Sequence, residues 1–139
     1  MTVEMFVGIL VAGVYALLSA LHVYWALGGS AGSTAVLPRV GERPAFQPSL
    51  LATVLVALAL AAASALVLCR VGIARWPLAD WMLRPCMYAL GAVFALRAIG
   101  DFRLVGFFKR VRGTRFARLD SWFFAPLCAA LASGVLWLA

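Results

Sequence analysis

Residues 50–69 read LLATVLVALALAAASALVLC and contain no charge. A helix of that length rises about 30 Å, which is the thickness of the hydrocarbon core of a bilayer. Three further apolar runs of similar length accompany it, at residues 5–27, 82–100 and 122–139. The sequence therefore predicts an all-α, polytopic membrane protein, with residues 1–139 forming a single four-transmembrane-helix bundle.

The composition excludes an ordinary soluble domain. Apolar residues make up 65% of the chain, only 12% is charged, and the mean hydropathy is +1.02. A soluble fold of 139 residues has too little interior to hide so much apolar surface. The net charge of +7 is more simply explained by membrane topology and anionic lipid than by nucleic acid, so we predict no nucleic-acid partner.

Basic residues are unevenly distributed between the two sides of the predicted bundle. Nine of the 12 Lys and Arg residues lie on one side: eight are in the loops 28–49 and 101–121, and Arg97 lies just before the second loop. The other three lie on the opposite side. The positive-inside rule then makes both loops cytoplasmic and places both termini outside. We expect five of these residues to contact anionic phospholipid headgroups: Lys109, Arg110, Arg112, Arg115 and Arg118.

The third apolar run is too short to span a bilayer between its charges. Arg84 and Arg97 are separated by 12 residues, or about 18 Å of helix. Either Arg84 reaches outward and the helix ends just after Arg97, or the helix continues to residue 108 with Arg97, Asp101 and Arg103 inside. In both cases Arg97 lies below the membrane surface and needs a partner, and Asp101 is the nearest carboxylate.

A short interfacial helix is predicted between the third and fourth membrane helices. Within residues 102–111 the apolar side chains fall on one helical face: Leu104, Val105, Phe108 and Val111. Gly113 is expected to end this helix, and Asp120 or Ser121 to cap the fourth membrane helix.

One group of polar residues is a candidate ligand site. His22, the only histidine, follows Tyr15 and Ser19 on one face of the first helix, at a depth similar to Arg97. A histidine beside a carboxylate and arginines is able to bind an anionic headgroup or exchange a proton. The alternative is a satisfied polar contact that fixes helix packing. The candidate residues are His22, Trp25, Arg97, Asp101 and Arg103.

The cysteines give no metal or cofactor signal. Cys69, Cys86 and Cys128 form no CxxC pair and have no spacing to histidine that is typical of a metal site. Cys69 and Cys86 both fall near the predicted outer face, where a disulfide between them is conceivable. We therefore expect no metal and no cofactor.

Small residues recur at every fourth position along three of the predicted helices. Such stripes allow close helix packing in lipid. They favour packing within one bundle and leave open a homo-oligomer or another membrane partner. The stripes are Gly8, Ala12, Ala16 and Ala20; Ala57, Ala61 and Ala65; and Ala125, Ala129 and Ser133.

Several motifs resemble a known bacterial family. They are His22-Val-Tyr-Trp25-Ala-Leu-Gly28-Gly29, Arg97-Ala-Ile-Gly100-Asp101-Phe102-Arg103, Val105-Gly-Phe-Phe-Lys109, Gly113-Thr114, Phe116-Ala-Arg118 and Asp120. Over essentially the whole chain the sequence resembles the membrane family called domain of unknown function 3995. The resemblance implies four membrane helices in a bacterial inner membrane and no established activity. The chain has Phe124 and Ala125 where the family has Tyr and Ser before Pro-Leu-Cys, so a role that needs those hydroxyls does not transfer.

Three functions are compatible with these features. A non-catalytic accessory or scaffold component of the bacterial inner membrane is favoured, and an enzymatic role is not. The second is a binding protein or enzyme for an anionic amphipathic molecule at the cytoplasmic leaflet, using His22, Arg97, Asp101 and Arg103. The third is a small transporter, which would need the deeper position of the third helix.

Overall fold

Four helices of the protein are long and apolar enough to cross a membrane. The computed structural model describes residues 1–75 and 79–139, so the expected outer loop 70–81 lies only partly within it. The helices are α1 (Val3–Ala26), α3 (Leu50–Arg70), α4 (Asp80–Ile99) and a composite of α5 (Arg115–Leu119), the π-helical turn η1 (Asp120–Phe124) and α6 (Ala125–Leu138). The predicted all-α class with four membrane-length helices is confirmed.

The last helix begins seven residues earlier than predicted. The Thr114 hydroxyl accepts a hydrogen bond from the Ala117 amide at 3.1 Å and caps a helix that starts at Arg115. Asp120 and Ser121, which were expected to be caps, lie inside the helix instead. The prediction was wrong because the charged first turn, with Arg115 and Arg118, resembles a loop when only hydropathy is considered.

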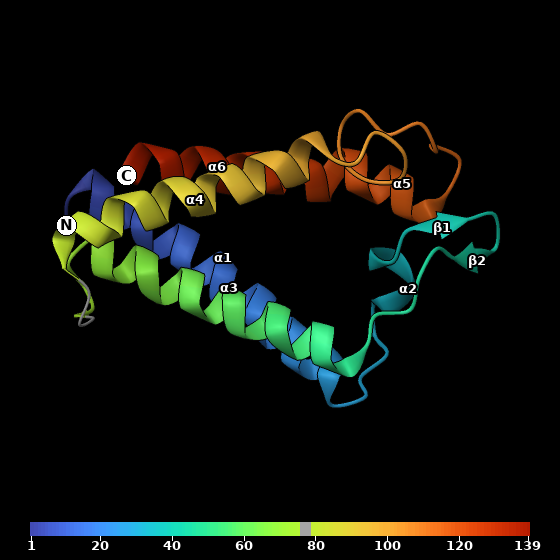
Figure 1. Cartoon of the computed structure of the whole chain (residues 1–139), viewed down its shortest axis with the longest axis horizontal. Helices are drawn as coiled ribbons and strands as arrows, with labels where there is room; N and C mark the ends of the chain where they lie inside the picture. Colours follow the sequence, from blue (N-terminus) through green and yellow to red (C-terminus); the bar gives the residue numbers. More distant parts are fainter. Residues whose placement is uncertain (76–78) are drawn as a thin grey trace.

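The helices form two antiparallel pairs (Figure 1). α1 packs along α3, and α4 packs along α6. The pairs converge at the end where both termini lie, which we call the terminal end. They diverge toward the other end, which carries residues 28–49 and 100–114 and which we call the loop end. Each pair is thus a packed unit, and the two units meet mainly at the terminal end.

The hydrophobic core lies toward the terminal end. Its members come from residues 11–15 of α1, residues 60–67 of α3, Met87 of α4 and residues 131–138 of α6. The most deeply buried are Tyr15, Val67, Met87 and Val135. The ring of Tyr15 meets that of Phe94 edge to face, with centroids 5.0 Å apart, and so joins α1 to α4.

Close approach between helices uses small residues and two buried hydroxyls. Ser19 Oγ donates to the Ala57 carbonyl at 2.7 Å, and Ser64 Oγ donates to the Ala12 carbonyl at 2.9 Å. Both bonds join α1 to α3, as expected of small polar residues in lipid. Only part of each predicted small-residue stripe is used, since Ala12 and Ala57 are buried but the other alanines of the first stripe are exposed.

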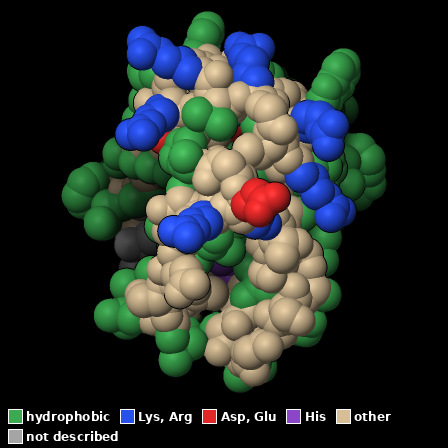
Figure 2. Space-filling view, turned by 90° about the vertical axis from the view of Figure 1, so that its right-hand side faces the viewer, with side chains coloured by type: hydrophobic (Ala, Val, Ile, Leu, Met, Phe, Trp, Pro, Cys, Tyr) green, Lys and Arg blue, Asp and Glu red, His purple; other side chains and the backbone are tan. Residues whose placement is uncertain are grey.

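The loop end is covered by short elements (Figures 1 and 2). The four-residue helix α2 (Ser33–Val36) lies next to α5, and the strands β1 (Arg39–Val40) and β2 (Arg43–Pro44) pair as a small antiparallel hairpin. Figure 2 shows Lys and Arg side chains gathered over this end of the molecule. The polar surface of the protein is therefore concentrated at the loop end.

The predicted interfacial helix is absent, since residues 102–111 form an irregular loop that folds back on the end of α4. Two glycines with positive φ, Gly100 (90°) and Gly106 (87°), and Phe102 at 60° break any helical path. Asp101 also holds the amides of residues 103–105, which competes with helix formation. The prediction was wrong because hydrophobic periodicity ignores this turn chemistry.

Candidate functional site

A fully buried carboxylate, Asp120, is the centre of the polar network at the loop end. Its Oδ1 accepts from Arg97 Nη2 at 2.9 Å, and its Oδ2 accepts from Lys109 Nζ at 3.0 Å and from the Gly106 amide at 2.7 Å. The Asp120 side chain is 0% exposed. Both of its oxygens are therefore engaged by donors from two other segments of the chain.

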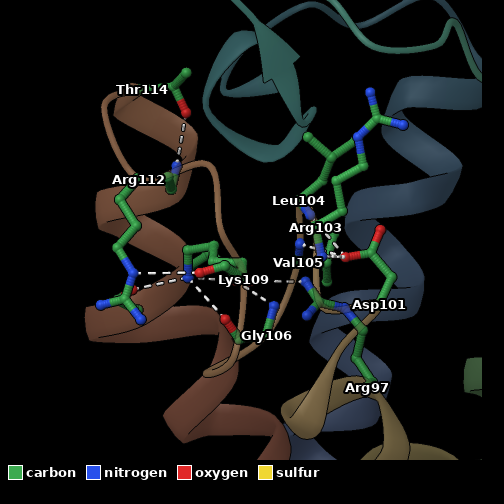
Figure 3. Close-up of polar contacts among 12 residues, drawn as sticks. Arg97, Asp101, Arg103, Leu104, Val105, Gly106, Lys109, Arg112 and Thr114 are labelled. Atoms are coloured by element: carbon green, nitrogen blue, oxygen red, sulfur yellow. Dashed lines mark hydrogen bonds and ion pairs between the residues drawn. The ribbon is translucent and has the colours of Figure 1, made fainter.

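Lys109 is equally buried and equally engaged. Its Nζ donates to the Gly106 carbonyl at 2.9 Å, to Asp120 Oδ2 at 3.0 Å and to Ser121 Oγ at 2.8 Å. An ammonium has three protons, so each of them has an acceptor here. Figure 3 shows Lys109 and Gly106 between α4 and the last helix, with Arg97 reaching up from α4. We call Arg97, Gly106, Lys109, Asp120 and Ser121 the Asp120 clamp.

Local backbone features place the clamp residues. Asp120 begins the π-helical turn η1, where the Ala125 amide donates to the Asp120 carbonyl five residues back. Gly106 has a φ of +87°, and a Cβ there would collide with the backbone of Ile99 and Gly100. The loop is therefore able to lie against the end of α4 only with glycine at position 106.

Arg97 pairs with Asp120 rather than with Asp101, the partner expected from spacing. Asp101 is exposed, and its Oδ1 accepts from the amides of Arg103 (2.9 Å), Leu104 (2.7 Å) and Val105 (3.0 Å). Slight desolvation raises the pKa of Asp101, but these amide hydrogen bonds outweigh it and hold the pKa below its usual value. Asp101 shapes the loop and leaves Arg97 to Asp120.

His22 and Trp25 stabilise the end of α1 instead of joining the clamp. His22 Nδ1 donates to the Leu18 carbonyl at 2.8 Å, and its ring meets Trp25 edge to face at 5.1 Å. Trp25 Nε1 donates to the Ala31 carbonyl at 3.0 Å, which ties the following turn back to the helix. Within the described part of the chain, no hydrogen bond or ion pair joins His22 to Arg97 or Asp101.

Two arginines of the predicted ligand site retain hydrogen-bonding capacity. Arg97 is 34% exposed, and its second terminal nitrogen, Nη1, is buried without a hydrogen-bond partner among the described residues. The side chain of Arg103 is exposed beside the loop.

The basic residues expected to contact lipid divide into two kinds. Lys109 is 0% exposed and belongs to the clamp, so the expectation that it contacts lipid is corrected. The other four are exposed at the loop end: Arg110, Arg112, Arg115 and Arg118.

The three cysteines are free thiols in this structure, so no disulfide joins Cys69 to Cys86. Both line one apolar cavity of about 440 Å³ between α3 and α4. No cluster of three or more His, Cys, Asp or Glu residues able to hold a metal occurs in residues 1–75 and 79–139.

Comparison with known families identifies the chain. Residues 15–135 match the family described as Protein of unknown function (DUF3995). The chain belongs to the DUF3995 family. The resemblance inferred from the motifs is thereby confirmed, and the matched region contains the whole Asp120 clamp. No curated protein and no solved structure matched the chain in the other two comparisons.

Sequence reasoning missed the pairing of Lys109 with Asp120, although both residues belong to the motifs that carry the DUF3995 resemblance. A usable signal was present. Asp120 is the only acidic residue between positions 115 and 138, a segment long and apolar enough to span a membrane. A carboxylate in such a segment requires a buried partner, and the basic loop just before it supplies one.

Proposed function

We propose that this DUF3995 protein is a non-catalytic accessory or scaffold component of the bacterial inner membrane. The observation that carries the proposal is that Asp120 and Lys109, at the centre of the clamp, are buried and fully engaged by partners within the chain. A general acid, base or nucleophile needs a free lone pair or proton that faces a substrate. Asp120 and Lys109 are 0% exposed, and every proton of the ammonium already has an acceptor within the chain.

The clamp has the properties of a structural fastening. It connects α4, the 100–114 loop and the last helix through residues far apart in sequence. Burial of the ion pair excludes water and salt from it, so it holds a fixed geometry where exposed pairs do not. The loop end, which presents Arg110, Arg112, Arg115 and Arg118, is thereby kept as a rigid basic surface.

The same basic surface supports a proposed orientation of the protein in the membrane. We place the loop end in the cytoplasm, since nine of the 12 basic residues lie there or beside it. Exposed tryptophans near opposite ends of the helices support this placement, because indole rings favour the headgroup zone. Trp122 is 86% exposed toward the loop end, and Trp81 and Trp137 are 75% and 57% exposed toward the terminal end.

A second candidate function has one specific observation in its favour. The buried Arg97 Nη1 has no hydrogen-bond partner among the described residues, and Arg103 is exposed nearby in the chain. Two guanidinium groups of this kind would bind an anionic amphipathic molecule at the cytoplasmic leaflet. The transporter hypothesis gains no comparable support, because α4 ends at Ile99 and Arg97 lies in its last turn.

Native mass spectrometry of the detergent-purified protein tests these alternatives. The samples are wild type, Arg97→Ala, His22→Ala and Arg103→Ala, the last of which leaves the clamp intact. The accessory role predicts that all four carry only phospholipid in similar amounts. A bound species of defined mass that wild type retains and both Arg97→Ala and Arg103→Ala lose would overturn it in favour of the ligand-binding function.

A further inference from the structure

An open surface cavity of about 690 Å³ lies at the loop end, and none of its lining residues belongs to the Asp120 clamp. It is formed between the β1–β2 hairpin and the residues that lead into α5, and Arg39, Glu42, Thr114 and Arg115 contribute to its walls. The volume falls within the range of small-molecule binding sites. Figure 2 shows acidic and basic side chains adjacent to one another near the middle of this end.

Two guanidinium groups converge on the cavity from different elements. Arg39 donates to the carbonyl of Glu42 across the hairpin, and its side chain forms part of the cavity wall. Arg115 is exposed at the start of α5, and its side chain makes no hydrogen bond or ion pair within the described part of the chain. The Thr114 oxygen accepts from the Ala117 amide, so its hydroxyl proton is available to a ligand. Such donors suit phosphate oxygens.

A carboxylate shares the cavity with these donors. Glu42 lines it and forms no ion pair with Arg39 or Arg115. A simple anion would be repelled by this group, whereas a ligand that also carries a positive charge would be attracted by it. The cavity therefore presents two positive groups and one negative group to a single ligand.

We propose that this cavity binds a phosphoester that also bears a primary ammonium, as in a phosphoethanolamine headgroup. Arg39, Arg115 and the Thr114 hydroxyl bind the phosphate, and Glu42 accepts from the ammonium. The assignment does not depend on the accessory role, since no residue of the clamp lines the cavity.

The cavity lies close enough to the membrane interface, along the last helix, for a lipid headgroup to reach it. Arg115 lies seven residues before the exposed Trp122, or about 10 Å along the helix axis. With Trp122 at the membrane interface, the cavity opens at the outer part of the headgroup zone. A lipid headgroup or a soluble phosphoethanolamine is able to reach it there.

The test measures binding of defined probes to the full-length, delipidated protein in detergent by native mass spectrometry. The probes are short-chain phosphatidylethanolamine and phosphatidylglycerol, with soluble phosphoethanolamine and inorganic phosphate as competitors. Wild type should prefer phosphatidylethanolamine. Arg39→Ala and Arg115→Ala should each weaken its binding about tenfold, as expected for loss of one charge-assisted contact. Glu42→Gln should abolish or reverse the preference over phosphatidylglycerol.

Arg43→Ala is the matched control, because Arg43 is an exposed arginine of the same hairpin as Arg39 that does not line the cavity. It should leave binding within about twofold, below the effect of one lost contact. If soluble phosphoethanolamine competes as strongly as the lipid does, the ligand is a soluble molecule. If soluble phosphoethanolamine fails to compete, the ligand is the lipid. Both outcomes support the shared headgroup chemistry. Equal binding of the two lipids to wild type, equal competition by inorganic phosphate, or an Arg43→Ala effect as large as that of Arg39→Ala would overturn the proposal.

Discussion

Replacement of Asp120 by asparagine isolates the charge of the clamp. The substitution keeps the size of the side chain and one oxygen acceptor for the Gly106 amide, but it leaves the Lys109 ammonium buried without a counter-charge. Lys109 and Asp120 are both 0% exposed, and loss of one member of such a pair costs about 3–5 kcal/mol. The Arg97 contact adds little, because that side chain is 34% exposed and its charge is screened.

We therefore expect Asp120→Asn to lower the free energy of unfolding by about 3–5 kcal/mol, which corresponds to a fall in Tm of roughly 10–17 °C for a chain of this size. A thermal ramp in detergent with a thiol-reactive dye provides the assay. The protein supplies its own reporters, since Cys69, Cys86 and Cys128 are free and partly buried and become accessible on unfolding.

Two comparisons make the result decisive. Asp101→Asn applies the same chemical change to an exposed carboxylate of the 100–114 loop and should shift Tm much less. Adding Lys109→Met to Asp120→Asn should restore part of the lost stability, because it removes the stranded ammonium. The reasoning is refuted by an Asp120→Asn shift no larger than that of Asp101→Asn, or by a double variant in which the two losses simply add.

Three further predictions follow from single residues. Gly106→Ala should destabilise the protein by about 1–3 kcal/mol or more, because position 106 has a positive φ and the new Cβ would contact backbone atoms. Gly113→Ala, at a position with open space around it, should be nearly neutral in the same thermal assay. Ser64→Ala should lower the free energy of unfolding in detergent by about 0.6–2 kcal/mol, because it removes the hydrogen bond from Ser64 to α1. Ser133→Ala should lower it by less, because the hydrogen bond of Ser133 stays within its own helix. The pKa of Asp101 is lower in the folded protein than in the unfolded chain, so its contribution to loop stability should be complete above about pH 4 and should disappear as the pH falls through the folded pKa. Hydrogen exchange of the amides of residues 103–105, followed as a function of pH, measures this contribution. Amide protection that does not change over that pH range would contradict the prediction.

Hydropathy predicted the four membrane helices because the signal is local and strong. A run such as 50–69 has few other ways to satisfy its backbone in lipid, so the existence of each helix follows from composition. The start of the last helix was missed because its first turn is basic. Thr114 decides that boundary through one hydrogen bond, which hydropathy does not register.

The candidate site was predictable in its residues but not in its pairings. Spacing along a helix selects neighbours four residues apart, and it therefore assigned Asp101 to Arg97. The structure joins Arg97 to Asp120, 23 residues away, through a loop conformation that positive φ angles at Gly100 and Gly106 determine. Long-range pairing of this kind depends on tertiary folding and cannot be derived from local periodicity.

The distribution of polar and apolar contacts explains why the clamp lies where it does. The hydrophobic core joins both helix pairs at the terminal end, where side chains such as Tyr15 and Val135 are fully buried. At the loop end the pairs diverge, and the clamp lies within the α4–α6 pair rather than between the two pairs. A buried ion pair is effective at that position because directional hydrogen bonds from Lys109 and Arg97 fix α4, its loop and the last helix relative to one another, alongside the packing of the buried Phe116 and Ala117.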